Sequence, residues 1–125
     1  MFQSILYVAA GSALGGVCRY LMQQSIQKHV MGFFPYGTLA VNLLGCFLIG
    51  MIYGLAAKNN VLSPQGRLFL AVGICGGFTT YSSFMMENYT LAQSGQIVSM
   101  LLYTGLSLVV GYAATALGVL SVKWV

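Results

Sequence analysis

Four long apolar stretches, joined by short polar connections, decide what this chain can fold into. A transmembrane helix needs about 20 consecutive, mostly apolar residues, and each stretch is long enough to cross a bilayer once. They occupy nearly all of the 125 residues and leave no room for a soluble domain. The sequence therefore predicts an all-α membrane protein with a single four-span domain over 1–125. We place the spans roughly at Gln3–Ser25, Tyr36–Ala57, Ser63–Ala92 and Gln96–Val122.

The charges exclude a water-soluble protein. Only 5% of the residues are charged, whereas a soluble domain carries about 25%. Glu87 is the single acid, and no run of basic residues indicates a nucleic-acid partner. Lys28, Lys58 and Lys123 stand singly near span ends, where they can anchor to lipid headgroups, and Trp124 suits the same interface. The first apolar stretch lacks a basic region before it, so we expect it to be retained as a span.

The distribution of basic residues predicts an unusual topology. An even number of spans places both termini on one side of the membrane, with Lys58, Arg67 and Lys123, while Lys28 and Arg19 lie toward the other. Such a weak bias barely favours one orientation. We therefore expect a dual-topology protein that forms an antiparallel homodimer. Glycines four residues apart predict tight helix packing within each subunit: Gly11/Gly15, Gly50/Gly54 and Gly73/Gly77.

The third span carries the most informative segment. Two adjacent glycines, Gly76 and Gly77, precede a cluster of hydroxyl residues in mid-membrane. A glycine pair permits a helix to unwind, and non-helical backbone survives at this depth only where it is buried in protein or lines a cavity. The freed carbonyls can bind a cation, and the new helix N-terminus can face an anion. The alternative is a kinked structural helix whose hydroxyls bond back to carbonyls. The hydroxyls are those of Thr79, Thr80, Ser82 and Ser83.

Several side chains near this segment favour an anion. Tyr81 and Phe84 share a helical face, and aromatic ring edges are electropositive, although such pairs also occur in cores and against lipid. Asn42 in the second span can donate its NH2 to an anion or make an interhelical hydrogen bond, and Thr38 lies one turn away. The fourth span carries a polar stripe that is expected to face the interior: Tyr103, Thr104, Ser107, Gly111 and Thr115.

Three motifs in order give the chain a specific family resemblance. The segments 15–20 (GGVCRY), 37–50 (GTLAVNLLGCFLIG) and 76–84 (GGFTTYSSF) resemble the Fluc (CrcB) fluoride channel family, and the likeness covers essentially the whole chain. The resemblance implies an antiparallel homodimer with two fluoride pores, which exports fluoride passively across the plasma membrane of a microbial cell and relieves its toxicity. It also implies a sodium ion at the dimer interface, held by the backbone carbonyls of Gly76 and Thr79.

The resemblance also assigns roles to side chains. Arg19 and Thr38 are expected in a vestibule, where a cation raises the local anion concentration, and Glu87 matches the family's acid late in the third span. Two positions depart from the family pattern, because Tyr81 stands where phenylalanine is usual and Gly111 lacks the last hydroxyl of the polar track. The residues expected along the fluoride pore are Asn42, Thr80, Tyr81, Ser83, Phe84, Tyr103 and Ser107.

Two other functions compete with a fluoride channel. A small multidrug-type proton-coupled exporter has a similar size and layout, but it needs an acid within the membrane, typically in the first span, where this chain has Arg19 instead. A helper subunit that transports nothing would account for the glycine packing. It would not account for the donor-rich faces of spans two, three and four. The sequence predicts no enzymatic chemistry.

Overall fold

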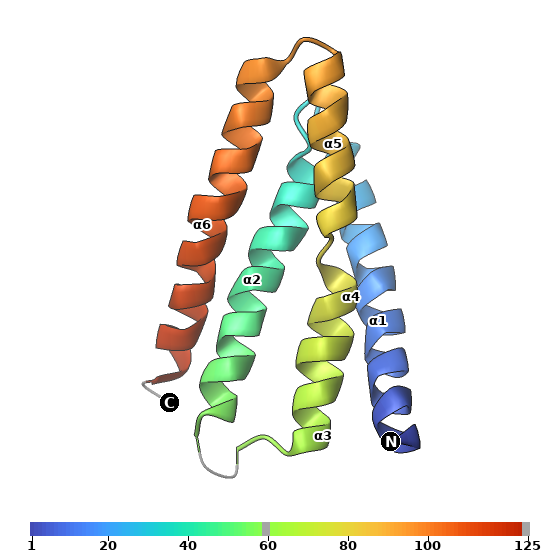
Figure 1. Ribbon diagram of the computed structural model, residues 1–125, viewed down its shortest axis with the longest axis vertical. Helices are drawn as coiled ribbons and strands as arrows, with labels where there is room; N and C mark the ends of the chain where they lie inside the picture. The colour runs from blue at the N-terminus through green and yellow to red at the C-terminus, as the bar shows by residue number, and fades with distance from the viewer. Residues whose placement is uncertain (59–60, 124–125) are drawn as a thin grey trace.

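The computed structural model describes residues 1–58 and 61–123, and almost all of them are helical (Figure 1). The predicted spans agree with the observed helices to within two residues at each end. Asn59, Asn60 and Trp124, for which a loop and an interfacial position were predicted, lie outside the described residues. The elements are α1 (Phe2–Gln27), α2 (Tyr36–Ala56), a segmented third span of α3 (Pro64–Arg67), η1 (Leu68–Cys75), α4 (Gly76–Phe78) and α5 (Tyr81–Gln93), and α6 (Ile97–Lys123).

Local sequence explains where the helices begin and end. The Ser63 hydroxyl accepts a hydrogen bond from the Gly66 amide at 2.9 Å and Pro64 is the first residue of α3, an arrangement that favours a helix start. Gly95 has a φ of +76°, a left-handed conformation that lets the chain turn between α5 and α6. Short turns of this kind keep consecutive helices side by side.

Four helical stretches in the described residues are long and apolar enough to cross a membrane, the third of them spanning Pro64–Gln93 with its internal break. Many large apolar side chains point away from the bundle, among them Leu14 and Val17 of α1 and Val109 of α6. Hydrocarbon is the solvent that suits such a surface. The beginning of α1 and the end of α6 lie at the same end of the molecule (Figure 1), as an even number of spans requires.

The helices pack as two close pairs, with α1 against η1 and α4, and α2 against α6. The predicted glycine pairs lie at these contacts. A Cβ added at Gly73 would lie 2.8 Å from the Gly11 Cα, and one added at Gly77 would lie 2.5 Å from the Ser12 carbonyl oxygen. In the other pair, a Cβ at Gly50 would overlap the Thr115 carbonyl oxygen. Small residues thus let the backbones approach closely where no hydrophobic effect drives helices together.

A neighbouring pair of glycines gives a sharp test of this packing. A Cβ at Gly15 would overlap the Ile74 carbonyl oxygen, whereas one at Gly16 would meet nothing within 4 Å. We expect Gly15→Ala to destabilise the protein by about 3 kcal/mol, because the clash is with backbone. We expect Gly16→Ala to stabilise it by up to about 1 kcal/mol through helix propensity. The measurement is the midpoint of thermal unfolding in detergent, and equal midpoints for the two variants would contradict the close approach of α1 to η1.

The third span contains a feature that the sequence did not indicate. The eight residues of η1 form a π-helix, and the Gly76 amide donates to the Ala71 carbonyl five residues earlier. The π geometry is rare and usually occurs as a single turn at functional sites. It leads directly into α4 and the break.

The break lies within the predicted segment 76–84, but after the glycine pair. Gly76 and Gly77 are helical residues of α4, and the extended backbone falls at Thr79 (φ −88°, ψ 159°) and Thr80 (φ −146°, ψ 119°). The backbone freedom of the glycine pair is therefore not what opens the helix. Gly77 serves close packing against α1, and threonine, a β-branched residue, readily adopts the extended conformation.

Candidate functional site

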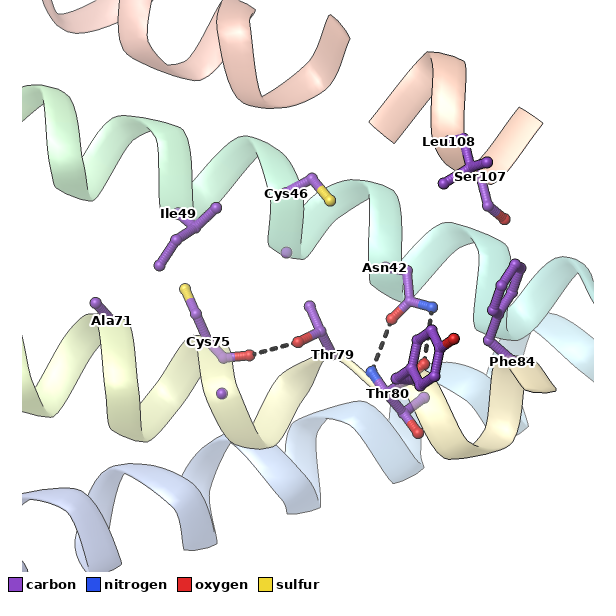
Figure 2. Close-up of a pocket in the computed structure, with 13 residues that line it drawn as sticks. Asn42, Cys46, Ile49, Ala71, Cys75, Thr79, Thr80, Phe84, Ser107 and Leu108 are labelled. Atoms are coloured by element: carbon purple, nitrogen blue, oxygen red, sulfur yellow. Dashed lines mark hydrogen bonds between the residues drawn. The ribbon is translucent and has the colours of Figure 1, made fainter. Parts of the chain in front are cut away.

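Asn42 of α2 stabilises the non-helical backbone at the break in the third span through two hydrogen bonds. Its Oδ1 accepts from the Thr80 amide at 2.8 Å, and its Nδ2 donates to the Thr80 carbonyl at 3.1 Å. Figure 2 shows the two residues facing each other between α2 and the third span. One side chain thereby satisfies both backbone groups of Thr80, which lipid cannot do. Of the two interpretations that the sequence left open, the interhelical hydrogen bond is present, and the second hydrogen of Nδ2 is still able to donate elsewhere.

The break also frees carbonyl groups. In a continuous helix the Gly76 carbonyl would accept from the Thr80 amide, but that amide donates to Asn42. The Thr79 carbonyl would accept from the Ser83 amide, but that amide donates to the Thr80 hydroxyl at 3.2 Å. Side chains have therefore taken the helical donors of the two carbonyls to which the family resemblance assigns a sodium ion.

A third carbonyl at the break is capped by Arg19 of α1. Its Nε donates to the Gly77 carbonyl at 3.2 Å, and its Nη1 donates to Gln23 Oε1 at 3.1 Å. The predicted vestibule arginine thus packs beside the break rather than projecting freely. Its positive charge lies beside the break, where it would attract an approaching anion.

A cavity of about 410 Å³ lies between α2, the third span and α6 (Figure 2). Its wall is polar around the break and apolar elsewhere, and the apolar part includes Ile49, Ala71 and Leu108. It brings together seven of the predicted site residues: Asn42, Gly76, Thr79, Thr80, Tyr81, Phe84 and Ser107.

Two residues of this cavity differ from the rest in their surroundings. The Ser107 hydroxyl is buried and has no hydrogen bond among the described residues. Tyr81 is 73% exposed, although its ring lies 6.2 Å from that of Phe84, between centroids. A buried hydroxyl without a partner costs free energy unless water, an ion or a second protein surface satisfies it.

A second cavity, of about 420 Å³, lies on the α1 side, toward the connection between α1 and α2. Gln23, Thr38 and Glu87 line part of it. Glu87 is held by two hydroxyls, because Thr38 donates to its Oε2 at 2.7 Å and Tyr103 donates to its Oε1 at 2.9 Å. The only acid of the chain is thus fixed between α2, α5 and α6.

Aromatic rings connect the two cavities. Phe84 borders the first cavity, and its ring lies 5.0 Å from that of Tyr103, whose hydroxyl reaches Glu87 beside the second. Tyr103 is fully buried and Phe84 nearly so. These two rings therefore form the core between α5 and α6, and Phe84 is also part of the wall of the first cavity. Tyr81, whose ring neighbours that of Phe84, is the exposed member of this row of three aromatic rings.

The structure brings most of the predicted site residues to the two cavities. Three of them line neither cavity: Arg19, Ser83 and Tyr103. The Ser83 amide is used in the N-cap of α5. Sequence reasoning missed Gln23 and Gln27. Gln27 Oε1 accepts from the Gly37 amide at 3.0 Å and its Nε2 donates to the Phe34 carbonyl at 3.3 Å, which fixes the connection between α1 and α2. The spacing of four residues along Arg19, Gln23 and Gln27 was the available signal, because it places all three on one helix face.

Comparisons with known proteins agree with this geometry. Residues 6–119 match the family described as CrcB-like protein, Camphor Resistance (CrcB). A protein of Flavobacterium psychrophilum named fluoride-specific ion channel FluC is 45% identical over 97% of this chain and 98% of its own length. Proteins with the same name from Chlorobium luteolum and Chlorobium chlorochromatii are 44% and 45% identical over 96% of this chain and 92% of theirs. With one family pattern and full-length relatives in agreement with four membrane-crossing helices and a broken third span, the chain belongs to the CrcB family.

Proposed function

We propose that this chain is a subunit of a fluoride channel, a multi-pass protein of the plasma membrane. Relatives that are about 45% identical over nearly their full length carry the name fluoride-specific ion channel FluC. The observation that carries the proposal is the cavity at the break, whose largely apolar wall holds a few hydrogen-bond donors. A small, strongly hydrated anion gives up its water only where donors replace it, and a channel must bind it weakly enough to release it.

The donors in and around the cavity fit this requirement. The free hydrogen of Asn42 Nδ2, the unpartnered hydroxyl of Ser107 and the ring edge of Phe84 all border the same space. None of these groups carries a full positive charge, which would hold fluoride too tightly for rapid conduction. The path would continue past the Tyr103 ring toward the second cavity, which Gln23 and Thr38 line, and Arg19, bonded to Gln23, would attract anions nearby.

The proposed assembly is an antiparallel homodimer. The first cavity presents Asn42, Thr80 and Tyr81 on the outside of a single subunit, and polar groups of this kind are not left against hydrocarbon. A second copy in the opposite orientation would cover them and would give two pores per dimer. The weak charge bias of the loops supports insertion in both orientations.

A sodium ion at the subunit interface fits the carbonyl groups of the break. Sodium prefers oxygen ligands; Gly76 and Thr79 both line the cavity, and the helical donors of their carbonyls are bonded to side chains instead. When bound, the ion would supply positive charge that compensates the partial negative charges of these carbonyl oxygens, and it would join the two subunits. The residues themselves keep the backbone extended at Thr79 and Thr80, with or without the ion.

The test of the function is fluoride efflux from liposomes that contain the purified protein, followed with a fluoride electrode. We expect rapid fluoride efflux and no chloride efflux. Proton-dependent uptake of a cationic drug would instead support the multidrug-type exporter, and the absence of any flux would support a helper subunit. Either result would contradict a fluoride channel.

The assembly is tested separately by the accessibility of single cysteines. In a background without Cys18, Cys46 and Cys75, a cysteine at Lys28 or at Lys58 should be labelled partly from each side of the membrane. Labelling of each position from one side only would contradict dual topology.

The sodium site is tested by replacing external and internal sodium by a large organic cation, which should lower flux. Unchanged flux together with unchanged dimer stability in sodium-free buffer would contradict a sodium site.

A further inference from the structure

A single file of hydrogen bonds runs from Arg19 across the bundle to Glu87. Arg19 Nη1 donates to Gln23 Oε1 at 3.1 Å, and Gln23 Nε2 donates to the Thr38 hydroxyl at 2.9 Å. Thr38 donates to Glu87 Oε2 at 2.7 Å, and Tyr103 donates to Oε1 of the same carboxylate at 2.9 Å. The file joins α1, α2, α5 and α6 through one glutamine.

The direction of these bonds is fixed by chemistry. Arg19 has no acceptor, so the amide oxygen of Gln23 must face it and the amide NH2 must face Thr38. Thr38 then accepts from Gln23, and its own proton is directed to Glu87. Both carboxylate oxygens of Glu87 therefore accept, which is the pattern that suits its charged form.

Gln23 is the residue that makes this arrangement possible. Thr38 accepts and donates through one hydroxyl, whereas Gln23 accepts at its amide oxygen and donates from its amide nitrogen. It lies between the guanidinium of Arg19 and the Thr38 hydroxyl, and so links Arg19 to the carboxylate of Glu87 through hydrogen bonds. Gln23 itself also lines the second cavity, beside Thr38 and Glu87.

We propose that Gln23 is a positioning residue of the ion path, which acts by holding the Thr38 hydroxyl on Glu87 and so keeps this carboxylate fixed away from the passing anion. The inference rests on the proposed fluoride channel. Glu87 borders the second cavity, where a negative charge that turned inward would repel fluoride. With Gln23 in place, Thr38 and Tyr103 hold both oxygens from the side of α2 and α6.

The first test removes both bonds of Gln23 without changing its length. We expect Gln23→Met to lower fluoride efflux about tenfold, the effect of losing a hydrogen bond that supports a charged group. Gln23→Glu keeps the acceptor for Arg19 and removes only the donor to Thr38, so it should lower efflux at least as much. Gln3→Met is the control, because Gln3 is an exposed glutamine of the same helix. Unchanged efflux in both Gln23 variants would overturn the proposal.

A double-mutant cycle separates positioning from a purely structural role. In a Glu87→Gln background there is no carboxylate charge to hold, so Gln23→Met should change efflux less than about twofold. An equal, tenfold loss in both backgrounds would show that Gln23 supports only the fold and would overturn the proposal. A complete loss of efflux in Glu87→Gln alone would overturn it as well, because the charge itself would then be required. Failure of the wild-type protein to carry fluoride would instead contradict the proposed function.

Discussion

Replacing Asn42 by aspartate should abolish fluoride efflux. The carboxylate can still accept from the Thr80 amide, as Asn42 Oδ1 does at 2.8 Å, but it cannot donate to the Thr80 carbonyl or to an anion. Two unit charges of the same sign about 4 Å apart repel each other by about 4 kcal/mol at an effective dielectric constant of about 20. That repulsion corresponds to a loss of flux of roughly a thousandfold, measured as the initial rate of efflux from liposomes.

A second membrane asparagine provides the control for this substitution. Asn88 is buried, its Nδ2 donates to the Phe84 carbonyl at 3.0 Å, and its Oδ1 accepts from the Thr104 hydroxyl at 3.0 Å. Asn88→Asp therefore also loses a donor and buries a charge, but the side chain lines neither cavity. We expect lower stability and near-normal flux per amount of folded protein. Flux above a tenth of wild type in Asn42→Asp would remove Asn42 from the predicted path.

The spans, the interior face of α6 and the family could all be predicted from the sequence, because each depends on a repeated pattern. Apolar length defines the spans, and the helical period places Tyr103 and Gly111 on one buried face. The glycine pairs were also predictable as contacts, since only a residue without a side chain permits two helix backbones to touch in lipid.

The segment that contains the break could be predicted, but the residues at which its backbone becomes extended could not, because they depend on contacts between distant residues. Sequence pointed to Gly76 and Gly77 through their backbone freedom, but close packing against α1 keeps Gly77 helical. The extended backbone at Thr80 is stabilised by Asn42, which lies 38 residues away in the chain. No local propensity reports a hydrogen bond of that kind.

The role of Arg19 was predictable only in part. Its charge within a span indicated an interior position, but its bonds to the Gly77 carbonyl and to Gln23 arise from the packing of α1 on α4. The same packing aligns Gln23 with Thr38 of α2. Sequence can identify polar residues that must find partners in the membrane, whereas the choice of partner follows from how the helices meet.

Removing the hydroxyl of Tyr103 should lower fluoride efflux by about ten- to a hundredfold. This hydroxyl is one of the two donors that hold Glu87, and a hydrogen bond to a charged group contributes about 1.5–3 kcal/mol. Tyr103→Phe leaves the ring in place against Phe84 and Phe34, at centroid distances of 5.0 and 5.7 Å, so the core between α5 and α6 should remain packed. The measurement is efflux per amount of folded protein, with the thermal midpoint in detergent as a second readout.

Tyr112 of the same helix separates this effect from the loss of any tyrosine hydroxyl. It is 81% exposed, and Tyr112→Phe should change neither flux nor stability. Because Tyr103 is both a core ring and a donor to Glu87, the two readouts distinguish its roles. Reduced flux at a nearly unchanged midpoint would assign the hydroxyl to the ion path through its hold on Glu87. Full flux at a lowered midpoint would assign it to the core alone, and Ser107 would then be the hydroxyl on which the α6 side of the predicted path depends.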